Sequence, residues 1–570
     1  MKQVVNALTM AQSDKFTIEN LGVSAYDLMK KAGEAIFASY DFKSVSTAIK
    51  CKFDCENSAH SGKKLPCNCK NENVFNCNDI ATAKTESAEN CENKITAKTE
   101  SAENCENSNI AIVCGKGNNG GDGFALANVF LDNAIFNFSV FYIDGKRSPE
   151  SEAFFASLNA RGFKNLHIID ENFTFINFNV DVIVDCLLGT GLTNAPTGLY
   201  KVAINAINNA KTLNSNAKPF IISADVPSGL NGSNGLATGE AVKSDLTVCI
   251  NTLKSGLLLN DGKDYAKNYV VCDIGIKIVG ESYSLFTAQD AQNILPKRPN
   301  NCHKNTFGKL AIIGGCNNYI GATKLATKGA TAVASGVGIV KLCVAKSIAK
   351  YLFESVEECT LFSLPDNGGN LLFDKEQIDL ALSDCTAVVI GVGIGRSEDI
   401  INIVNYIISN YNLPVIIDAD GLNALANDVK MLRSAKAQII LTPHPKEFCR
   451  LSGLSVNAIL QNPIETAQNF AKEYNCVVLL KGCATIVTNG KDVLINTAGC
   501  ANMAKGGSGD VLSGVIGAIM AQGANAMDGA ILGAYICGKA GELAKKQYCE
   551  VSATPLDTIN NIKFAIKEII

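Results

Sequence analysis

The sequence predicts an α/β protein with two domains, each built on a mostly parallel β-sheet that carries helices on both faces. Its 570 residues are too many for a single hydrophobic core, so two domains of about 250 residues each are expected. Apolar residues make up 47% of the chain and charged residues 19%, which is enough to build buried cores. Short apolar runs alternate with glycine-rich turns and amphipathic helices, and this alternation is typical of parallel sheets.

The N-terminal domain is expected to span residues 1–278, with a helical start over the first 40 residues. Its strands are expected at 110–114, 138–143, 180–186 and 220–226. A polar insertion at about 51–108 interrupts it and repeats the segment AKTESAENCEN at 83–93 and 97–107. The insertion holds seven cysteines whose spacings lack paired CxxC knuckles, which favours a flexible surface segment over a zinc site.

The C-terminal domain is expected to span residues 303–570, after a linker at 279–302 in which two prolines interrupt the pattern. Its strands are expected at 310–315, 338–344, 387–393, 414–420 and 477–482. From about residue 510 the chain is rich in alanine and glycine and is expected to be helical.

Composition excludes several classes of partner. The net charge of −4 gives no basic surface for nucleic acid, and no apolar run reaches the ~20 residues of a membrane span. The first residues lack the apolar core of a signal peptide. We therefore expect a cytoplasmic protein that acts on small molecules, and we also expect a homo-oligomer. Cysteines outside the insertion lie in apolar segments, where buried thiols are expected.

A glycine-rich loop follows the first predicted strand and precedes a helix, in the segment GKGNNGGDG at 115–123. Such loops bring backbone N–H groups close to an anion at the start of the helix. The loop also satisfies GxGxxG, and Asp144 after the next strand offers the ribose-binding acid of a dehydrogenase. Asp122 argues against that alternative, because its carboxylate would repel a pyrophosphate unless it caps the helix or addresses another group.

Oxygen-bearing side chains follow the next strands. Asp185 ends one strand before a Gly-Thr-Gly turn at 189–191, and Asp225 and Ser228 end the following strand. The carboxyl ends of parallel strands converge on one crevice, where carboxylate, amide and hydroxyl oxygens suit a hard cation. The alternative for these aspartates is capping of helices or turns. Lys254 is a further ligand candidate, with a solvated surface lysine as an equally strong alternative.

With the preceding LMKKAGEAIF helix, the motifs GKGNNGGDG, VDCLLGTGL and ADVPSGLNG resemble the NAD(P)HX epimerase family, also called YjeF N-terminal domains. The resemblance covers residues 1–275 apart from the insertion, and it implies a Rossmann-like three-layer sandwich that interconverts the R and S epimers of hydrated NADH and NADPH. It places a potassium ion on Asn119, Asp185 and Ser228. Either Asp185 or Asp225 would act as the catalytic acid or base. The implied substrate contacts are Asn118, Asn119, Gly120, Gly121, Asp122, Gly189, Thr190, Gly191, Leu192, Thr193, Asn194, Ala195 and Asp225.

A second glycine-rich segment, NMAKGGSGDVLSG at 502–514, opens a helix in the C-terminal half. Its backbone N–H groups can hold a phosphoryl group while Asp510 reaches a substrate hydroxyl, which is most of what phosphoryl transfer needs. The alternative is an ordinary helix cap. His444, with Glu447 nearby, follows another strand between two prolines, and Lys481 and Thr485 can meet a nucleotide phosphate. Further strand-end residues are Gly391, Gly393, Gly395, Asp420 and Asn423.

The motifs HKNTFGKLAIIGG, NYIGATKLA, GVGIGR, DADGLNAL, LTPHPKE, LLKGCAT and GGSGD resemble the ADP-dependent NAD(P)HX dehydratase family, which has a ribokinase-like three-layer sandwich. The resemblance covers nearly all of 303–570. It implies that the added hydroxyl is phosphorylated from Mg²⁺-bound ADP and that phosphate is then eliminated, with Asp510 as the base. The implied contacts to the hydrated cofactor are Ala322, Gly393, His444 and Asp510, and those to the nucleotide are Lys481, Gly482, Cys483, Ala484, Thr485 and Gly509.

Two departures from the family pattern add positive charge near the proposed phosphate site, Lys446 in LTPHPKE and Lys505 before GGSGD. Residue chemistry does not decide between ADP and ATP, and ADP follows from the resemblance of the fused arrangement to bacterial members. The fusion of the two domains is consistent with this interpretation. If the dehydratase accepts only one epimer of the hydrated cofactor, an attached epimerase lets the protein remove both epimers. The alternatives are a ribokinase-like small-molecule kinase fused to a Rossmann dehydrogenase, or an N-terminal half that binds nucleotides without turnover.

Overall fold

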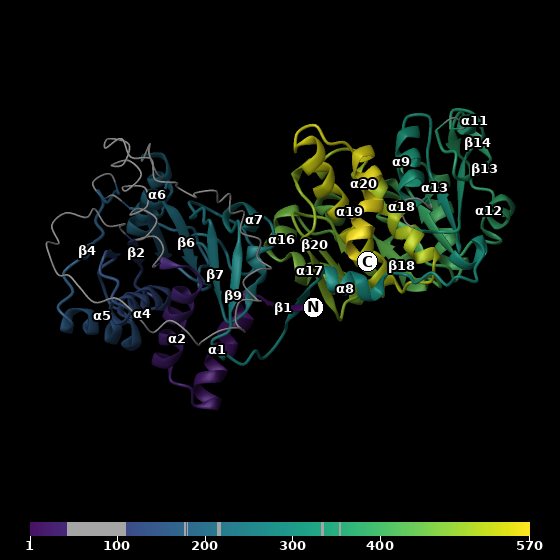
Figure 1. Cartoon of the computed structure of the whole chain (residues 1–570). Coiled ribbons are helices and arrows are strands. Elements are labelled where there is room, and N and C mark those ends of the chain that lie inside the picture. The colour runs from purple at the N-terminus through teal and green to yellow at the C-terminus, as the bar shows by residue number, and fades with distance from the viewer. Residues whose placement is uncertain (43–109, 176–177, 179, 214–217, 332–335, 353–354) are drawn as a thin grey trace, which may run out of the picture.

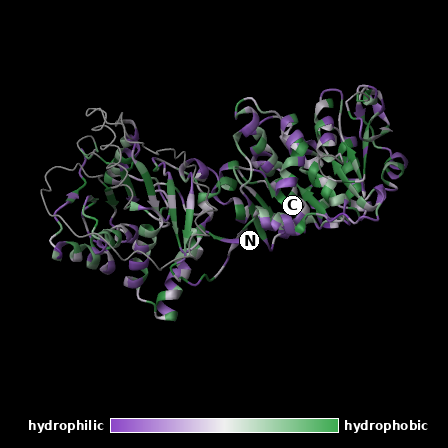
Figure 2. Cartoon of the chain, viewed as in Figure 1, coloured by the Kyte–Doolittle hydropathy of each residue, from purple (hydrophilic) through white to green (hydrophobic). Residues whose placement is uncertain are grey.

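The computed structural model describes residues 1–42, 110–175, 178, 180–213, 218–331, 336–352 and 355–570 (Figure 1). Two α/β bodies lie side by side, and the N-terminus lies at their junction. The insertion expected at 51–108 falls outside the described residues. Apolar residues gather in the strands at the centre of each body, and hydrophilic residues gather on the outer helices (Figure 2). In the part of the chain that the structure describes, no helix combines the length and apolar character needed to cross a bilayer.

The N-terminal body is a three-layer sandwich around a seven-stranded sheet in the order β4-β3-β2-β5-β6-β7-β9, with parallel neighbours throughout. The strands are β2 (Ile110–Cys114), β3 (Phe138–Tyr142), β4 (Leu166–Ile168), β5 (Val182–Cys186), β6 (Phe220–Ala224), β7 (Leu246–Ile250) and β9 (Tyr269–Cys272). Its helices are α1 (Ala7–Leu21), α2 (Ala25–Ala38), α4 (Asn118–Asp132), α5 (Pro149–Ala160), α6 (Gly198–Leu213) and α7 (Gly262–Tyr265).

The side chains of β2 point alternately to the two faces of the sheet, and this explains the three layers of the body. Ile110 and Ile112 pack with α2, α4 and α5 on one face, whereas Ala111 and Val113 pack with α6 on the other. Successive side chains of a strand point to opposite faces, so a strand that is apolar at every position needs helices on both sides. The predicted fold of this half is confirmed.

The C-terminal body is built on a twelve-stranded sheet in the order β13-β12-β11-β16-β17-β18-β19-β20-β21-β10-β1-β8. The strands from β13 to β19 are parallel, and β20 and β21 add an antiparallel hairpin. These strands are β11 (Lys309–Ile313), β12 (Ile339–Ala345), β13 (Thr360–Leu364), β16 (Ala387–Ile390), β17 (Val415–Ile417), β18 (Ile439–Leu441), β19 (Val477–Leu480), β20 (Thr485–Thr488) and β21 (Val493–Asn496). A separate pair is formed by β14 (Asp366–Asn367) and β15 (Asn370–Leu371).

Two groups of helices cover this sheet. One comprises α9 (Ile320–Ala330), α18 (Ser508–Ala521), α19 (Ala526–Tyr548) and α20 (Pro555–Ile569), which pack on one another and on the central strands. The other comprises α13 (Glu398–Asn410), α14 (Asp420–Leu425), α15 (Pro445–Ser452), α16 (Val456–Gln461) and α17 (Pro463–Tyr474). Short elements complete the body: α8 (Ala288–Ile294), α11 (Lys346–Ala349), α12 (Lys375–Leu382) and the 3₁₀ turns at 304–307, 429–434 and 501–503. The predicted α/β class of this half is also confirmed.

The first residues join the two bodies. The sequence predicts helix from the start, but Lys2–Val5 form strand β1 before α1 begins. Strand β1 pairs with β10 (Tyr283–Leu285) and with β8 (Leu253–Lys254), and β10 pairs with β21. Strand β10 and helix α8 thus occupy the range expected as a linker. Strands of two to four residues are too short to produce a recognisable alternation, and only their partners in the fold stabilise them.

Candidate functional site

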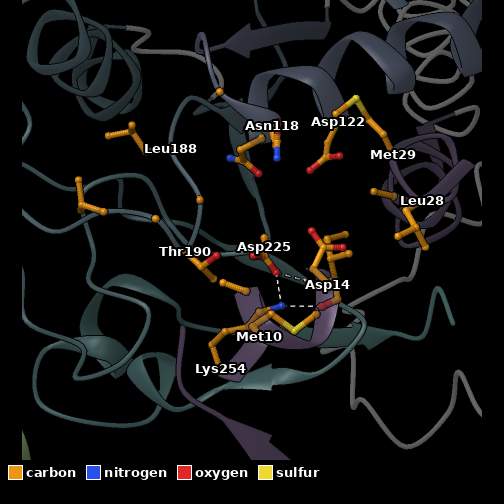
Figure 3. A pocket seen from close by; sticks show the side chains of 18 of the residues that line it. Met10, Asp14, Leu28, Met29, Asn118, Asp122, Leu188, Thr190, Asp225 and Lys254 are labelled. Carbon is orange, nitrogen blue, oxygen red and sulfur yellow. Dashed lines mark hydrogen bonds and ion pairs between the residues drawn. The ribbon is translucent and has the colours of Figure 1, made fainter. Parts of the chain in front are cut away.

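A cavity of about 660 Å³ opens in the N-terminal body at the carboxyl ends of the parallel strands (Figure 3). Its walls come from α1, α2, the glycine loop at the start of α4, the loop after β5, and residues that follow β6 and β7. The sequence-predicted residues that line it are Asn118, Asn119, Asp122, Gly189, Thr190, Gly191, Leu192, Thr193, Asn194 and Asp225. The separate strand-end motifs therefore meet in one place, as the sheet topology requires.

Three predicted contacts lie outside the lining of this cavity: Gly120, Gly121 and Ala195. A Cβ atom on Gly120 would lie 2.0 Å from the carbonyl oxygen of Gly115, and one on Gly121 would lie 2.5 Å from the Sδ atom of Met29. These two glycines are therefore needed for the close packing of α4 against the strand end and against α2.

Asp185 is fully buried behind the cavity wall and does not line the cavity. Its carboxylate accepts hydrogen bonds from the backbone N–H and the hydroxyl of Ser228, at 2.9 and 2.5 Å, from the hydroxyl of Ser223 at 2.9 Å, and from the N–H of Leu187 at 3.2 Å. Burial raises the pKa of Asp185, and these hydrogen bonds oppose that rise. The carboxylate holds the ends of β5 and β6 together, and of the two candidate acids only Asp225 faces the cavity.

Asp225 lies at the cavity wall in a left-handed backbone conformation, with φ of 66°. Its Oδ1 atom accepts hydrogen bonds from the N–H of Ile250 at 3.1 Å and from the Nζ atom of Lys254. Lys254 is fully buried and also donates to the carbonyl of Ile250, so the surface alternative for this lysine is wrong. The pair places a carboxylate and an ammonium group side by side on the cavity surface (Figure 3).

Three further carboxyl groups line the same cavity, Asp122 from α4, Asp14 from α1 and Glu150 from α5, and the first two have raised pKa values. The pKa of Asp122 is raised well above its ordinary value, first by burial and then by the charges of Asp225 and Asp14. The pKa of Asp14 is raised by burial and by Asp225, while Lys254 lowers it. Sequence reasoning missed Asp14, because a single acid in an amphipathic helix carries no signal until tertiary packing turns it toward a cavity.

An oxygen-rich corner lies beside this group. Both atoms of the Asn119 side-chain amide are buried and have no hydrogen-bond partner among the described residues. Asn119 lies against Gly189, where an added Cβ atom would be 3.4 Å from the Asn119 Cβ. In the same loop, the N–H of Leu188 donates to the hydroxyl of Ser228 at 2.9 Å. A buried amide without a partner costs free energy unless a ligand satisfies it, so the corner has the donor set of a cation site.

The second candidate site surrounds Asp510, which lies in the first turn of α18. The pKa of Asp510 is raised to about 7, first by burial and then by the negative charge of Asp418, Asp420 and Glu447, while Lys481 lowers it. Asp418 is buried after β17 and accepts hydrogen bonds from the Nζ atom of Lys481 at 3.1 Å and from the hydroxyl of Ser513 at 2.6 Å. Asp418 and Ser513 were not predicted from the sequence.

The start of α18 provides an open cradle. No side chain caps the helix, and Gly507 precedes it with φ of 100°. A Cβ atom on Gly506 would meet nothing within 4 Å, and one on Gly509 would lie 3.4 Å from the Nζ atom of Lys481. The uncapped N–H groups, the open space and the ammonium group together suit an anion.

The other residues predicted for this half lie at several different positions in the C-terminal body. Ala322 and Gly393 lie together, since a Cβ atom on Gly393 would be 2.8 Å from that of Ala322. His444 caps α15, and its Nδ1 atom accepts from the N–H groups of Lys446 and Glu447, which places the ring proton on Nε2. Residues 481–485 form the turn between β19 and β20, with Cys483 exposed and Ala484 buried.

A second cavity of about 590 Å³ lies in the C-terminal body, and its lining includes the predicted residues Gly395, Asp420 and Asn423. Asp420 accepts hydrogen bonds from the N–H of Gly395 at 3.1 Å and from the Nε atom of Arg396 at 3.3 Å. Lys505, which was expected to add positive charge near the phosphate site, makes a structural contact instead. Its Nζ atom donates to the carbonyls of Val551 and Ala553 and so anchors the α19–α20 connection.

Comparison with known proteins gives two family matches. Residues 310–563 match the family model described as NAD(P)H-hydrate dehydratase, and residues 82–256 match that of the YjeF-related protein N-terminus. A relative from Moorella thermoacetica, named bifunctional NAD(P)H-hydrate repair enzyme Nnr, is 31% identical over 81% of this chain and 88% of its own length. A protein of the same name from Escherichia coli is 33% identical over 77% of this chain and 81% of its own length.

Solved structures also match about half of this chain. One is titled ADP/ATP-dependent NAD(P)H-hydrate dehydratase from Bacillus subtilis, co-crystallised with ATP and Mg²⁺. It is 24% identical, covers 50% of this chain and 99% of its own, and has a TM-score of 0.44.

The raised pKa of Asp510 predicts that Asp510→Asn stabilises the protein above pH 7, by at most about 4 kcal/mol. Between about pH 4 and pH 7 the unfolded carboxyl ionises while the folded one stays protonated, so the stability of the unmodified protein falls as pH rises through this window. Denaturant unfolding at pH 4, 6 and 8 measures the difference, and Asp492→Asn at an exposed turn is the matched control. A difference that is the same at pH 4 and pH 8 would contradict this account of the site.

Proposed function

The chain belongs to the family of bifunctional NAD(P)H-hydrate repair enzymes, and we propose that it repairs hydrated NADH and NADPH at two separate sites. The N-terminal site interconverts the R and S epimers, and the C-terminal site dehydrates the S epimer at the expense of a nucleotide, with ADP as the expected donor. The observation that carries the proposal is that the 31% identical relative covers both halves and that each half holds a crowded acidic site at its strand ends.

At the C-terminal site, we propose that Asp510 accepts the proton of the substrate hydroxyl, whose oxygen then attacks the terminal phosphoryl group of ADP. The P–O bond to AMP breaks, and AMP departs with its electron pair. In the second stage the C–O bond of the phosphate ester breaks and the adjacent ring carbon loses a proton, which restores the double bond of NAD(P)H. A base with a pKa near 7 suits this task at neutral pH.

The other residues of this site hold the nucleotide and the base in place. Lys481 lies beside the start of α18, where its charge and the helix N–H groups can oppose the charge of a transferring phosphoryl group. Asp418 and Ser513 fix Lys481 and the first turns of α18, because one buried carboxylate binds both. Magnesium bound to the nucleotide would supply further neutralisation of its phosphates, and the open cradle at Gly506 leaves room for them.

At the N-terminal site, we propose that Asp225 and Asp122 act as base and acid. The carbon to be inverted carries the hydroxyl group and adjoins the ring nitrogen. Its inversion requires one of its bonds, either the C–O bond or a ring bond, to break and then to form again on the opposite face. Either route needs one proton donor and one proton acceptor. Burial raises the pKa of Asp122, and the charges of Asp225 and Asp14 raise it further, whereas Asp225 is paired with the buried Lys254. The two carboxyl groups therefore have different surroundings, as an acid and base pair requires.

We propose that Asn119, Ser228 and the Asp185 carboxylate hold a potassium ion beside this cavity. The unpartnered amide of Asn119 and the hydroxyl of Ser228 fit a large oxygen-liganded cation. Bound there, the ion would supply positive charge near the developing charge of the substrate. The homo-oligomer and the cytoplasmic location stay predictions.

The dehydratase proposal predicts that absorbance at 340 nm rises when the protein meets hydrated NADH with Mg²⁺ and ADP or ATP. Asp510→Ala should lower the rate at least 1000-fold because the base is lost, and kcat/KM should rise with pH to a plateau above about pH 7. Glu568→Gln, at an exposed carboxylate of α20, is the control. No NADH formation by folded protein with either nucleotide would refute this assignment and favour a small-molecule kinase.

The epimerase proposal predicts a selective loss in Asp225→Asn and Lys254→Met. With mixed epimers, the S fraction should return to NADH at the normal rate, while the R fraction should slow at least 100-fold because proton transfer is impaired. Asp144→Asn is a sharp control, since a dehydrogenase would need Asp144 for a ribose hydroxyl and an epimerase would not. If Asp144→Asn is impaired and Asp225→Asn is normal, the dehydrogenase alternative is right.

The potassium proposal predicts that replacing K⁺ with tetramethylammonium at equal ionic strength slows conversion of the R epimer at least tenfold. Dehydration of pure S epimer in the same solution is the internal control and should not change. Asn119→Ala should weaken the activation by K⁺, because one ligand of the ion is removed. An R-epimer rate that does not depend on K⁺ would refute the site.

A further inference from the structure

Lys263 of the N-terminal body contacts the backbone of the C-terminal body at two points. It lies in the short helix α7, and its ammonium group donates to the carbonyl of Cys483 at 3.0 Å and to the carbonyl of Thr497 at 2.7 Å. Both bonds have a charged donor, and hydrogen bonds of that kind are stronger than neutral ones. Since both acceptors are main-chain atoms, the contact constrains the path of the backbone rather than one side chain.

The two carbonyls belong to the two segments that surround the proposed nucleotide site. Cys483 lies in the turn at 481–485 between β19 and β20. Thr497 follows β21, at the start of the segment that leads through 498–507 into the cradle of α18. Strands β20 and β21 are antiparallel, with Thr485 opposite Asn496, so both carbonyls lie at the same end of this hairpin. One ammonium group therefore ties the nucleotide turn to the segment that enters the phosphate cradle.

The position of Lys263 is itself fixed within the N-terminal body. A Cβ atom on the preceding residue, Gly262, would lie 2.2 Å from the carbonyl oxygen of Gly256, so α7 is packed directly on backbone. Asp261 accepts a hydrogen bond from the N–H of Ala237 at 3.0 Å and holds the same segment. A packed, short helix is a firm base from which a long lysine side chain can restrain a neighbouring loop.

Other polar contacts cross the junction without touching the nucleotide turn. The Nδ2 atom of Asn260 donates to the carbonyl of Leu460 at 3.0 Å, and the Nδ2 atom of Asn234 donates to the carbonyl of Gln461 at 3.0 Å. These bonds reach the end of α16, which supplies none of the proposed site residues. The junction thus offers contacts that hold the bodies together and one contact that reaches the nucleotide site.

We propose that Lys263 is a positioning residue through which the N-terminal body sets the conformation of the nucleotide turn of the C-terminal body. The inference rests on the proposed function in one respect, that residues 481–485 bind the nucleotide. Lys263 acts through the carbonyls of Cys483 and Thr497 and contacts no substrate. The ammonium group keeps the turn in the shape that accepts ADP, so its loss weakens nucleotide binding and leaves the chemistry and the hydrated cofactor site unchanged.

The test compares Lys263→Met with Lys267→Met in the full-length chain. The first removes the donor but keeps most of the side-chain length, and the second removes an exposed lysine nearby that makes no interbody contact in the structure. For Lys263→Met we expect the KM for ADP and the Kd for ADP from titration calorimetry to rise about tenfold. The kcat at saturating ADP, the KM for S-hydrated NADH and the R-epimer conversion should stay within twofold. Lys263→Arg, which keeps the charge and the donors, should recover most of the affinity.

Asn260→Ala separates positioning from a general loosening of the junction, because it removes a crossing contact that does not reach the turn. It should leave the KM for ADP unchanged. The inference is overturned if Lys263→Met binds ADP normally, if Asn260→Ala or Lys267→Met weakens ADP binding as much, or if the KM for hydrated NADH rises equally. Calorimetry keeps the inference separate from the proposed function, since a Lys263-dependent Kd for ADP stands even if the protein fails to form NADH.

Discussion

Each half depends on its own buried aspartate, which lies where a central parallel strand ends. Asp185 in the N-terminal body and Asp418 in the C-terminal body are almost inaccessible to water. A buried carboxylate is tolerated only when donors surround it, so each one draws the loops of neighbouring strands together. Asp185 binds Ser223, Ser228 and Leu187, and Asp418 binds Lys481 and Ser513. The proposed catalytic acids lie close to these anchors in the fold, since Asp225 directly follows the strand that carries Ser223 and Asp510 shares a helix with Ser513.

Each half places one lysine at its candidate site, and the two lysines pair with different kinds of carboxylate. Lys254 pairs with the cavity-lining Asp225, so its charge falls on a group proposed to react. Lys481 pairs with the buried Asp418, while burial, followed by the negative charge of Asp418, raises the pKa of Asp510 to about 7. Burial together with neighbouring acids thus raises the pKa of Asp122 in one half and that of Asp510 in the other.

Much of this arrangement is predictable from the sequence, and the rest is not, for a physical reason. Strong local patterns located the long strands, the glycine turns and acids such as Asp225 and Asp510, because an apolar run followed by glycine and a polar residue is itself the structural signal. Asp418 directly follows the apolar run of β17 and does carry this signal, whereas Asp14 and Lys263 give none. Their roles come from neighbours far away in the chain, and the same holds for strands β1 and β10, which are too short for any periodicity to show.

The junction between the bodies explains why a fusion of two enzymes can be more than a tether. Strand β1 joins the C-terminal sheet through β10 and pairs with β8, whose second residue is Lys254 of the N-terminal site. The polypeptide that closes one sheet therefore also supports the other cavity. Lys263, nine residues further along, reaches the nucleotide turn of the other half. Any state of the C-terminal body that moves the carbonyl of Cys483 must change the energy of this contact, and binding free energies coupled in this way act equally in both directions. The two bodies are joined by strand pairing of β1 with β8 and β10 and of β10 with β21, so such a coupling has a path through backbone hydrogen bonds as well as along the chain.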